Sequence, residues 1–135
     1  MIRIQTDTIQ SRELRDFVAH AKAGAVLIFE GTTRDNFEGK DVVELRYETY
    51  KEMALSTLEK LRDELIAGHP DVRVAIAHRV GVVPVQESSV VIAVSAPHRD
   101  LAYRISRDAI DRLKREIPIW KKEIYADGGI WKENI

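Results

Sequence analysis

Hydrophobic residues in this chain change their spacing along the sequence, which predicts alternating strands and helices. Helical spacing of apolar positions occurs in three segments, near residues 11–22, 50–65 and 99–116. Alternating or unbroken β-branched runs, typical of strands, occur at residues 1–6, 24–33, 42–50, 72–80, 89–96, 119–125 and 130–133. Strand–helix–strand runs followed by a strand-rich tail favour an α/β or α+β domain.

The segments between these elements are short and carry turn residues. Residues 34–41 are polar and contain Gly39, so we expect a mobile loop there. Residues 81–87 contain glycine and proline and predict a turn-rich connection. Alternation along residues 42–50 predicts one shared face for Val43, Leu45, Tyr47 and Thr49. We find no repeat or interdomain linker, so residues 1–135 are expected to form a single domain.

The composition is that of an ordinary globular domain and excludes several kinds of chemistry. With 21 basic and 22 acidic residues the formal net charge is −1, so the chain as a whole does not attract nucleic acid or an anionic membrane. The absence of cysteine excludes disulfides, thiolate metal sites and a cysteine nucleophile. The first residues are polar and no long apolar run follows, so we expect a cytoplasmic location. Any anion site must come from a local group of basic residues.

A pair of lysines, Lys114 and Lys121, flanks the corner where the last predicted helix gives way to a strand. Pro118 disfavours helix at the preceding residue, so the chain turns sharply between the two lysines. Two ammonium groups held close together disfavour each other's charge, and partial burial adds to that effect. A lysine in this setting can serve as a nucleophile or a proton-transfer group. On spacing alone a solvated basic turn, balanced by nearby glutamates, is the alternative.

Strand alternation separates Lys121 from its neighbour Lys122. One face of the predicted strand carries Ile119, Lys121 and Glu123, and the other carries Trp120, Lys122 and Ile124. We therefore expect only Lys121 to share a pocket with Lys114. The four histidines lack metal-ligand spacing and the chain has no P-loop or dinucleotide fingerprint, so we expect neither a metal site nor a bound cofactor.

Two further basic positions are suited to binding an anion. His98 and Arg99 lie where a strand meets the last helix, whose first N–H groups carry partial positive charge. Arg34 follows the first buried strand. The alternatives are a solvated arginine with a histidine capping the strand end, and a surface pair of Arg34 with Asp35. We expect both arginines to border the pocket of Lys114 and to bind a phosphate there.

Several segments, taken in order, resemble the large, catalytic subunit of molybdopterin synthase. They are Gly24–Asp35, Leu45–Ala54, His78–Gly81, Pro97–Arg99 and Leu113–Glu123, followed by Asp127, Gly128 and Trp131. Each segment alone is weakly specific, but their order and spacing over nearly the whole chain are highly specific. The resemblance favours the functional interpretation of the lysine corner over a solvated turn.

The resemblance implies an α+β chain: an α/β hammerhead fold with an additional antiparallel β subdomain, working as a central homodimer. A small ubiquitin-like sulfur-carrier subunit is expected to dock at each end and to insert its C-terminal Gly-Gly tail, which carries a thiocarboxylate, into the pocket. Sulfur then passes to cyclic pyranopterin monophosphate and forms the dithiolene of molybdopterin. The lack of cysteine agrees with this reaction, because the sulfur arrives on the partner.

The same resemblance implies roles for individual residues. Lys114 and Lys121 match the catalytic lysines. The residues matching those that hold the phosphate and pterin are Arg34, His98 and Arg99, and in a homodimer Arg99 could serve the other protomer's lysines. Phe29 matches a residue near the tail and the pocket.

Two points qualify the comparison with the family. Some members have a basic residue shortly after the tryptophan equivalent to Trp131, where this chain offers only Lys132. A rival hypothesis is a non-catalytic binding module that recognises an acidic partner C-terminus through the same basic pocket.

Overall fold

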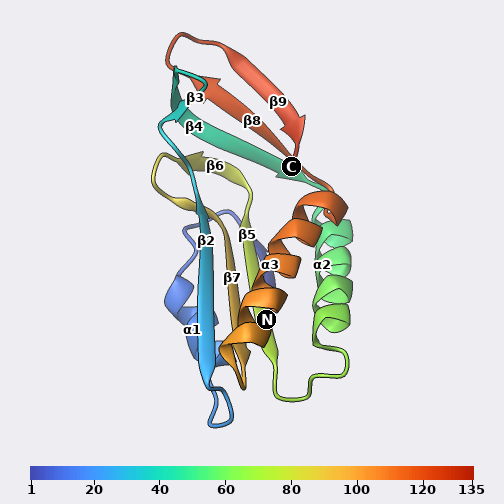
Figure 1. Cartoon of the computed structure of the whole chain (residues 1–135). Coiled ribbons are helices and arrows are strands. Elements are labelled where there is room, and N and C mark those ends of the chain that lie inside the picture. The colour runs from blue at the N-terminus through green and yellow to red at the C-terminus, as the bar shows by residue number, and fades with distance from the viewer.

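The computed structural model describes the backbone of all 135 residues and every side chain except that of Asn134. In chain order the elements are β1 (Ile2–Gln5), α1 (Ser11–Val18), β2 (Ala25–Thr32), β3 (Asn36–Phe37), β4 (Lys40–Thr49), α2 (Lys51–Ile66), β5 (Arg73–Arg79), β6 (Gly81–Pro84), β7 (Ser88–Ala96), α3 (Arg99–Glu116), β8 (Ile119–Tyr125) and β9 (Ile130–Asn134). Figure 1 shows a larger body of helices and strands with a second sheet at one end.

The larger body is a sheet with helices on both faces. Its strand order is β1-β5-β7-β2, with β1 parallel to β5 and the other pairs antiparallel. Helix α1 packs against one face, whereas α2 and α3 cover the other (Figure 1). Both faces are covered, so successive residues of the central strands β5 and β7 are buried whichever face they point to. This explains the unbroken apolar runs of these strands. Strand β2 lies at the edge of this sheet.

The second sheet has five strands and is antiparallel throughout, with the order β3-β4-β8-β9 and with β6 also paired to β4. In its register Tyr47 lies between Lys121 on β8 and Gly81 on β6. The chain thus has an α+β body with a separate antiparallel subdomain, and the expected fold class is confirmed.

Two connections contain strands that the sequence did not predict. Residues 81–84 form β6 instead of a turn-rich connection, because Gly81, with a φ of 81°, lets the chain turn directly after β5 and pair with β4. Residues 34–41 include a tight hairpin instead of a mobile loop alone. Its turn residues, Glu38 and Gly39, have φ values of 49° and 80°, and such left-handed pairs suit two-residue hairpins.

A bulge in β4 changes which side chains face inward, so the face predicted from alternation is partly wrong. Val43 is 50% exposed whereas Val42 is 7% exposed, although alternation had placed Val43 with Leu45 and Tyr47. The register of β4 against β8 shifts between Val42 and Glu44, and an extra residue in one strand changes which side chains face inward.

The corner between α3 and β8 is anchored in the core. Ile117 and Ile119 on either side of Pro118 are 2% and 0% exposed. The hydroxyl of Thr49 donates a 2.7 Å hydrogen bond to the carbonyl oxygen of Pro118. The path from α3 into β8 is therefore fixed by packing and by a hydrogen bond to the end of β4.

Candidate functional site

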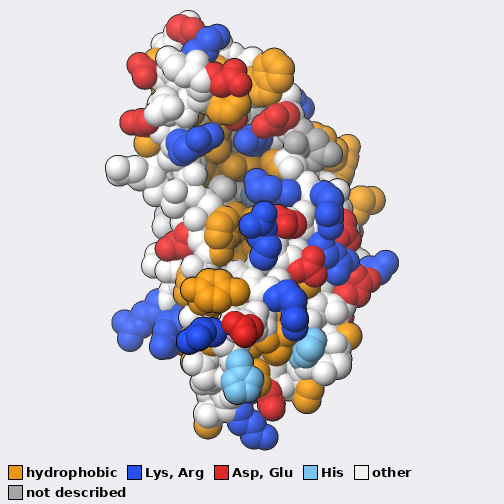
Figure 2. Space-filling view, in the orientation of Figure 1, with side chains coloured by type: hydrophobic (Ala, Val, Ile, Leu, Met, Phe, Trp, Pro, Cys, Tyr) orange, Lys and Arg blue, Asp and Glu red, His pale blue; other side chains and the backbone are white. Residues whose placement is uncertain are grey.

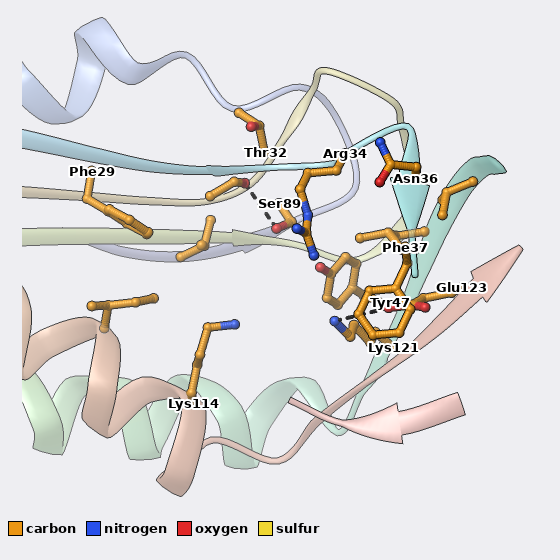
Figure 3. Close-up of a pocket in the computed structure, with 15 residues that line it drawn as sticks. Phe29, Thr32, Arg34, Asn36, Phe37, Tyr47, Ser89, Lys114, Lys121 and Glu123 are labelled. Carbon is orange, nitrogen blue, oxygen red and sulfur yellow. Dashed lines mark hydrogen bonds and ion pairs between the residues drawn. The ribbon is translucent and has the colours of Figure 1, made fainter. Parts of the chain in front are cut away.

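A pocket lies at the junction of the two sheets, where the end of α3 faces the second sheet. Its cavity measures about 170 Å³, and its polar lining includes Arg34, Tyr47, Ser89, Lys114, Lys121 and Glu123. Figure 3 shows the side chains of Arg34, Lys114 and Lys121 pointing into one space from three different segments. Figure 2 shows basic side chains gathered over the middle of this face. Three cations thus converge on one cavity.

Lys114 projects into the pocket from the last turn of α3. Burial lowers its pKa below that of an ordinary lysine, and the positive charge of Lys121 lowers the pKa further. Glu133 acts in the opposite direction without reversing the shift. The neutral amine of Lys114 is therefore easier to form than that of a solvated lysine.

The pKa of Lys121 shifts in the opposite direction, although Lys121 lines the same pocket. Its Nζ lies 3.1 Å from a carboxylate oxygen of Glu133 and 3.4 Å from one of Glu123. Burial disfavours its charge, but Glu133, Tyr47 and Glu123 together outweigh burial and raise the pKa of Lys121. The ammonium form of Lys121 is therefore the stable one.

Glu123 is a buried carboxylate, 4% exposed, that ties Lys121 to the rest of the subdomain. It accepts a 2.6 Å hydrogen bond from the hydroxyl of Tyr125. That bond and the negative charge of Glu123 raise the pKa of Tyr125 to about 12. A buried charge needs such partners, because an isolated one would be costly.

Arg34 and Phe29 line the pocket, as the sequence led us to expect. Among the described side chains Arg34 makes no ion pair within 4.0 Å, and Asp35 instead accepts a hydrogen bond from Asn36 at 2.9 Å. The guanidinium carbon of Arg34 lies 6.0 Å from the centre of the Phe37 ring. The surface pair of Arg34 with Asp35, considered from spacing, is thus not formed.

His98 and Arg99 do not line this pocket, which corrects the expectation of a shared pocket within one chain. They lie at the start of α3, whereas Lys114 is near its end. Fifteen residues of helix at ~1.5 Å each separate Arg99 from Lys114 by roughly 22 Å. The two arginines therefore open onto different parts of one chain.

The two remaining lysines of this region lie outside the pocket. Lys122 pairs with Glu48 at 2.9 Å, and Lys132 approaches the same carboxylate at 3.4 Å. Neither lines the cavity. The predicted separation of Lys121 from Lys122 is therefore confirmed, and Lys132 does not reach the pocket of its own chain.

Sequence reasoning missed Tyr47, Ser89 and Glu133 as members of the site. Tyr47 and Ser89 lie on strands whose pairing with distant segments sets what they face. Glu133 reaches Lys121 only because β9 folds back along β8. The alternation of residues 42–50 was the one available signal, and it placed Tyr47 on an inward face without naming its partners.

The described side chains contain no group of three or more His, Asp or Glu placed to hold a metal ion. In the part of the chain that the structure describes, every helix is too short or too polar to cross a membrane.

Comparison with known proteins identifies relatives along the whole chain. Residues 4–116 match the family described as MoaE protein. The chain is 50% identical over 137 residues to molybdopterin synthase catalytic subunit 1 of Aedes aegypti, covering 98% of this chain and 88% of that protein. It is 53% identical over 119 residues to the molybdopterin synthase catalytic subunit of Oryza sativa subsp. indica, covering 88% of this chain and 62% of that protein.

Solved structures show the same fold. Molybdopterin synthase from Staphylococcus aureus superposes with a TM-score of 0.92 at 38% identity, covering 98% of this chain and 96% of that chain. A complex of subunits 1 and 2 of molybdopterin-converting factor from Helicobacter pylori 26695 has a TM-score of 0.77 at 22% identity, covering 93% of this chain and 86% of that chain, a likeness of fold alone. The resemblance seen in the sequence is confirmed, and the chain belongs to the MoaE protein family.

Proposed function

We propose that this chain is the catalytic subunit of a molybdopterin synthase. It transfers sulfur from the thiocarboxylated C-terminus of a small ubiquitin-like subunit to cyclic pyranopterin monophosphate and forms the molybdopterin dithiolene. The observation that carries the proposal is the pocket in which two lysines with opposite pKa shifts face an arginine. The names of relatives about 50% identical to the chain support it.

The opposite pKa shifts assign different tasks to the two lysines. Lys114, whose neutral form is easier to reach than that of a solvated lysine, accepts a proton or attacks as an amine. Lys121 stays charged and stabilises negative charge that develops as sulfur adds and oxygen leaves. Arg34 supplies a fixed guanidinium for the phosphate.

The carrier's tail must enter this pocket with its sulfur in line. Phe29 and Phe37 line the cavity, and each residue is 36% exposed, so an extended glycine-rich tail can lie against them. A relative 50% identical to the chain is named as the catalytic subunit of a synthase, which supports a second subunit as partner. We place the reaction in the cytoplasm, as the sequence led us to expect.

We further propose that two chains combine and complete each other's pocket. Strand β2 has a free edge, and it exposes Ile28 and Phe29 at 38% and 36%. With Tyr103 of α3 they line an open groove between β2 and α3, where Figure 2 shows hydrophobic side chains. A two-fold axis beside an edge strand pairs it antiparallel with its copy. The start of α3 in one chain then lies beside the end of α3 in the other.

This arrangement gives His98 and Arg99 a role that a single chain does not. Each pair would reach the pocket that contains the other chain's Lys114. The size of the cavity supports this: about 170 Å³ in one chain is below the ~300–1,000 Å³ of small-molecule pockets. A second chain would add both lining residues and positive charge to the cavity.

Lys121→Ala should impair turnover far more than Lys122→Ala. Lys121 lines the cavity, whereas Lys122 pairs with Glu48 outside it. Loss of a positioned charge at a reacting centre costs ~10²–10³-fold, and loss of a surface ion pair costs little. Initial rates of dithiolene formation would measure both variants, and equal losses would contradict the assignment.

The rate should rise with pH as Lys114 loses its proton, and Lys121→Met should move that rise to higher pH. The charge of Lys121 lowers the pKa of Lys114, so its removal raises that pKa. The pH dependence of kcat/KM for wild type and variant measures the shift, with Lys122→Met as control. A rise that stays in place, or moves to lower pH, would show that Lys114 is not the group titrating.

The function itself is tested by reconstitution. Purified chain is mixed with thiocarboxylated small subunit and cyclic pyranopterin monophosphate, and the dithiolene product is measured by mass spectrometry. A carrier ending in an ordinary carboxylate is the control. Tight binding of both carriers without product would support the rival hypothesis of a non-catalytic binding module.

A further inference from the structure

Tyr47 is a buried side chain of the pocket to which neither the motifs nor the proposed chemistry gives a task. It lies on β4 directly opposite Lys121 on β8, so both side chains leave the sheet on the same face. The residue is 7% exposed and lines the cavity. Figure 3 shows its ring beside Lys121, with the hydroxyl end turned toward Arg34.

The ring of Tyr47 is fixed by neighbours that are themselves held in place. His78 packs edge-on against it, with ring centroids 5.1 Å apart. Nδ1 of His78 lies 2.8 Å from the carbonyl oxygen of Arg79, which can only accept, so Nδ1 carries the proton. Burial lowers the pKa of His78 to about 4, and the ring is therefore neutral at pH 7.

The hydroxyl of Tyr47 has a defined neighbour as well. Ser89 lies beside it, and Ser89 Oγ donates a 3.2 Å hydrogen bond to the carbonyl oxygen of Gly31. Burial is the main cause that raises the pKa of Tyr47, so its phenol stays protonated around neutral pH. A neutral hydroxyl can accept a hydrogen bond from an ammonium group and donate one to a ligand.

Lys121 has charged side chains on several sides. The charged neighbours in the pocket are Lys114 from α3, Glu133 from β9, Glu123 from its own strand and Arg34 after β2. The two carboxylates engage the ammonium group at 3.1 and 3.4 Å. An ammonium group has three N–H donors, so one remains for another partner.

We propose that Tyr47 is a positioning residue: its hydroxyl, presented from the facing strand, restrains the ammonium group of Lys121 toward the bound substrate. The inference rests on the proposed function, because Lys121 is the group through which Tyr47 acts. A rigid phenol fixed by His78 and Ser89 limits where the flexible lysine can lie. Small misplacements at a reacting centre reduce rates by up to ~10²-fold, so the effect falls on turnover more than on binding.

Tyr47→Phe tests the proposal, with Tyr50→Phe as its control. Tyr50 is 69% exposed, packs edge-on against Trp120 outside the pocket and loses the same single oxygen in the variant. Tyr47→Phe should lower kcat about 10- to 100-fold with little change in KM, whereas the control should match wild type. In a Lys121→Met background the same change should have almost no further effect. Equal losses with and without Lys121 would overturn the proposal.

A second readout needs no substrate. NMR of ¹³C,¹⁵N-lysine-labelled protein follows the titration of the Lys121 side chain, and Tyr47→Phe should lower its pKa because an acceptor for the ammonium group is gone. Ser89→Ala, which leaves the aromatic ring in place, should act in the same direction with smaller effect. An unchanged Lys121 titration in both variants refutes the positioning role. A wild-type protein that makes no dithiolene, while Lys121 still responds to Tyr47→Phe, would instead refute the proposed function.

Discussion

Lys114→Ala should leave the chain folded and remove most of its turnover. Lys114 lies on the open side of α3 and projects into the pocket, so its removal leaves the hydrophobic core intact. Its lowered pKa makes it the lysine of the pocket that is best suited to proton transfer or amine attack. Loss of one positioned acid–base group reduces rates by ~10²–10⁴-fold. Single-turnover formation of dithiolene product would measure the loss.

The neighbouring Arg115 provides the matched control. It follows Lys114 in the same helical turn, is exposed and does not line the cavity. Arg115→Ala should therefore keep near wild-type turnover. Chemical denaturation of both variants separates loss of chemistry from loss of folding. A folded Lys114→Ala protein with normal turnover would remove Lys114 from the mechanism.

Mixed dimers of Lys114→Ala and Arg99→Ala chains should regain activity that neither variant has alone. If each pocket combines Lys114 of one chain with Arg99 of the other, a mixed dimer contains one pocket with both defects and one intact pocket. A mixed dimer isolated by two affinity tags should then have about half the wild-type rate, and an unselected random mixture about a quarter. The mixture is prepared by co-expression with two affinity tags, and rates are compared with those of each homodimer.

The outcome of that experiment discriminates between two locations of Arg99. If Arg99 acts within its own chain, every pocket in the mixture carries a defect and no activity is recovered. If Arg99 acts outside the pocket, Arg99→Ala alone is fully active. A mixture of Lys114→Ala with Lys121→Ala is the control, because both residues line one chain's pocket and no recovery is expected.

Local sequence patterns predicted most of the fold because each element carries its own periodicity. The span of α3 from Arg99 to Glu116 was predicted correctly, since apolar spacing and Pro118 define its course and end. Strand β6 and the position of Val43 were not predicted. Both depend on pairing between strands distant in sequence, and a bulge changes the facing of side chains without any local signal.

The candidate site could be predicted where its residues are charged and lie at the end of a predicted helix or strand. Lys114, Lys121 and Arg34 were expected to meet and do line one cavity, while their catalytic roles stay predictions. Arg99 was placed in the same pocket because strand ends often converge. Within one chain that expectation is wrong, because Arg99 and Lys114 lie near opposite ends of α3. No local pattern in the sequence indicates which surface a second chain covers.

The two lysines also affect the free energy of folding, and they do so with opposite sign. The pKa of Lys114 is lower in the folded chain than in an unfolded one, so its charge destabilises the fold at every pH below its folded-state pKa. This destabilisation fades as pH rises through that pKa toward the unfolded value. Lys121, whose pKa is raised, stabilises the fold until pH rises through its own folded-state pKa. At neutral pH the chain therefore retains one lysine that weakens its fold beside another that strengthens it.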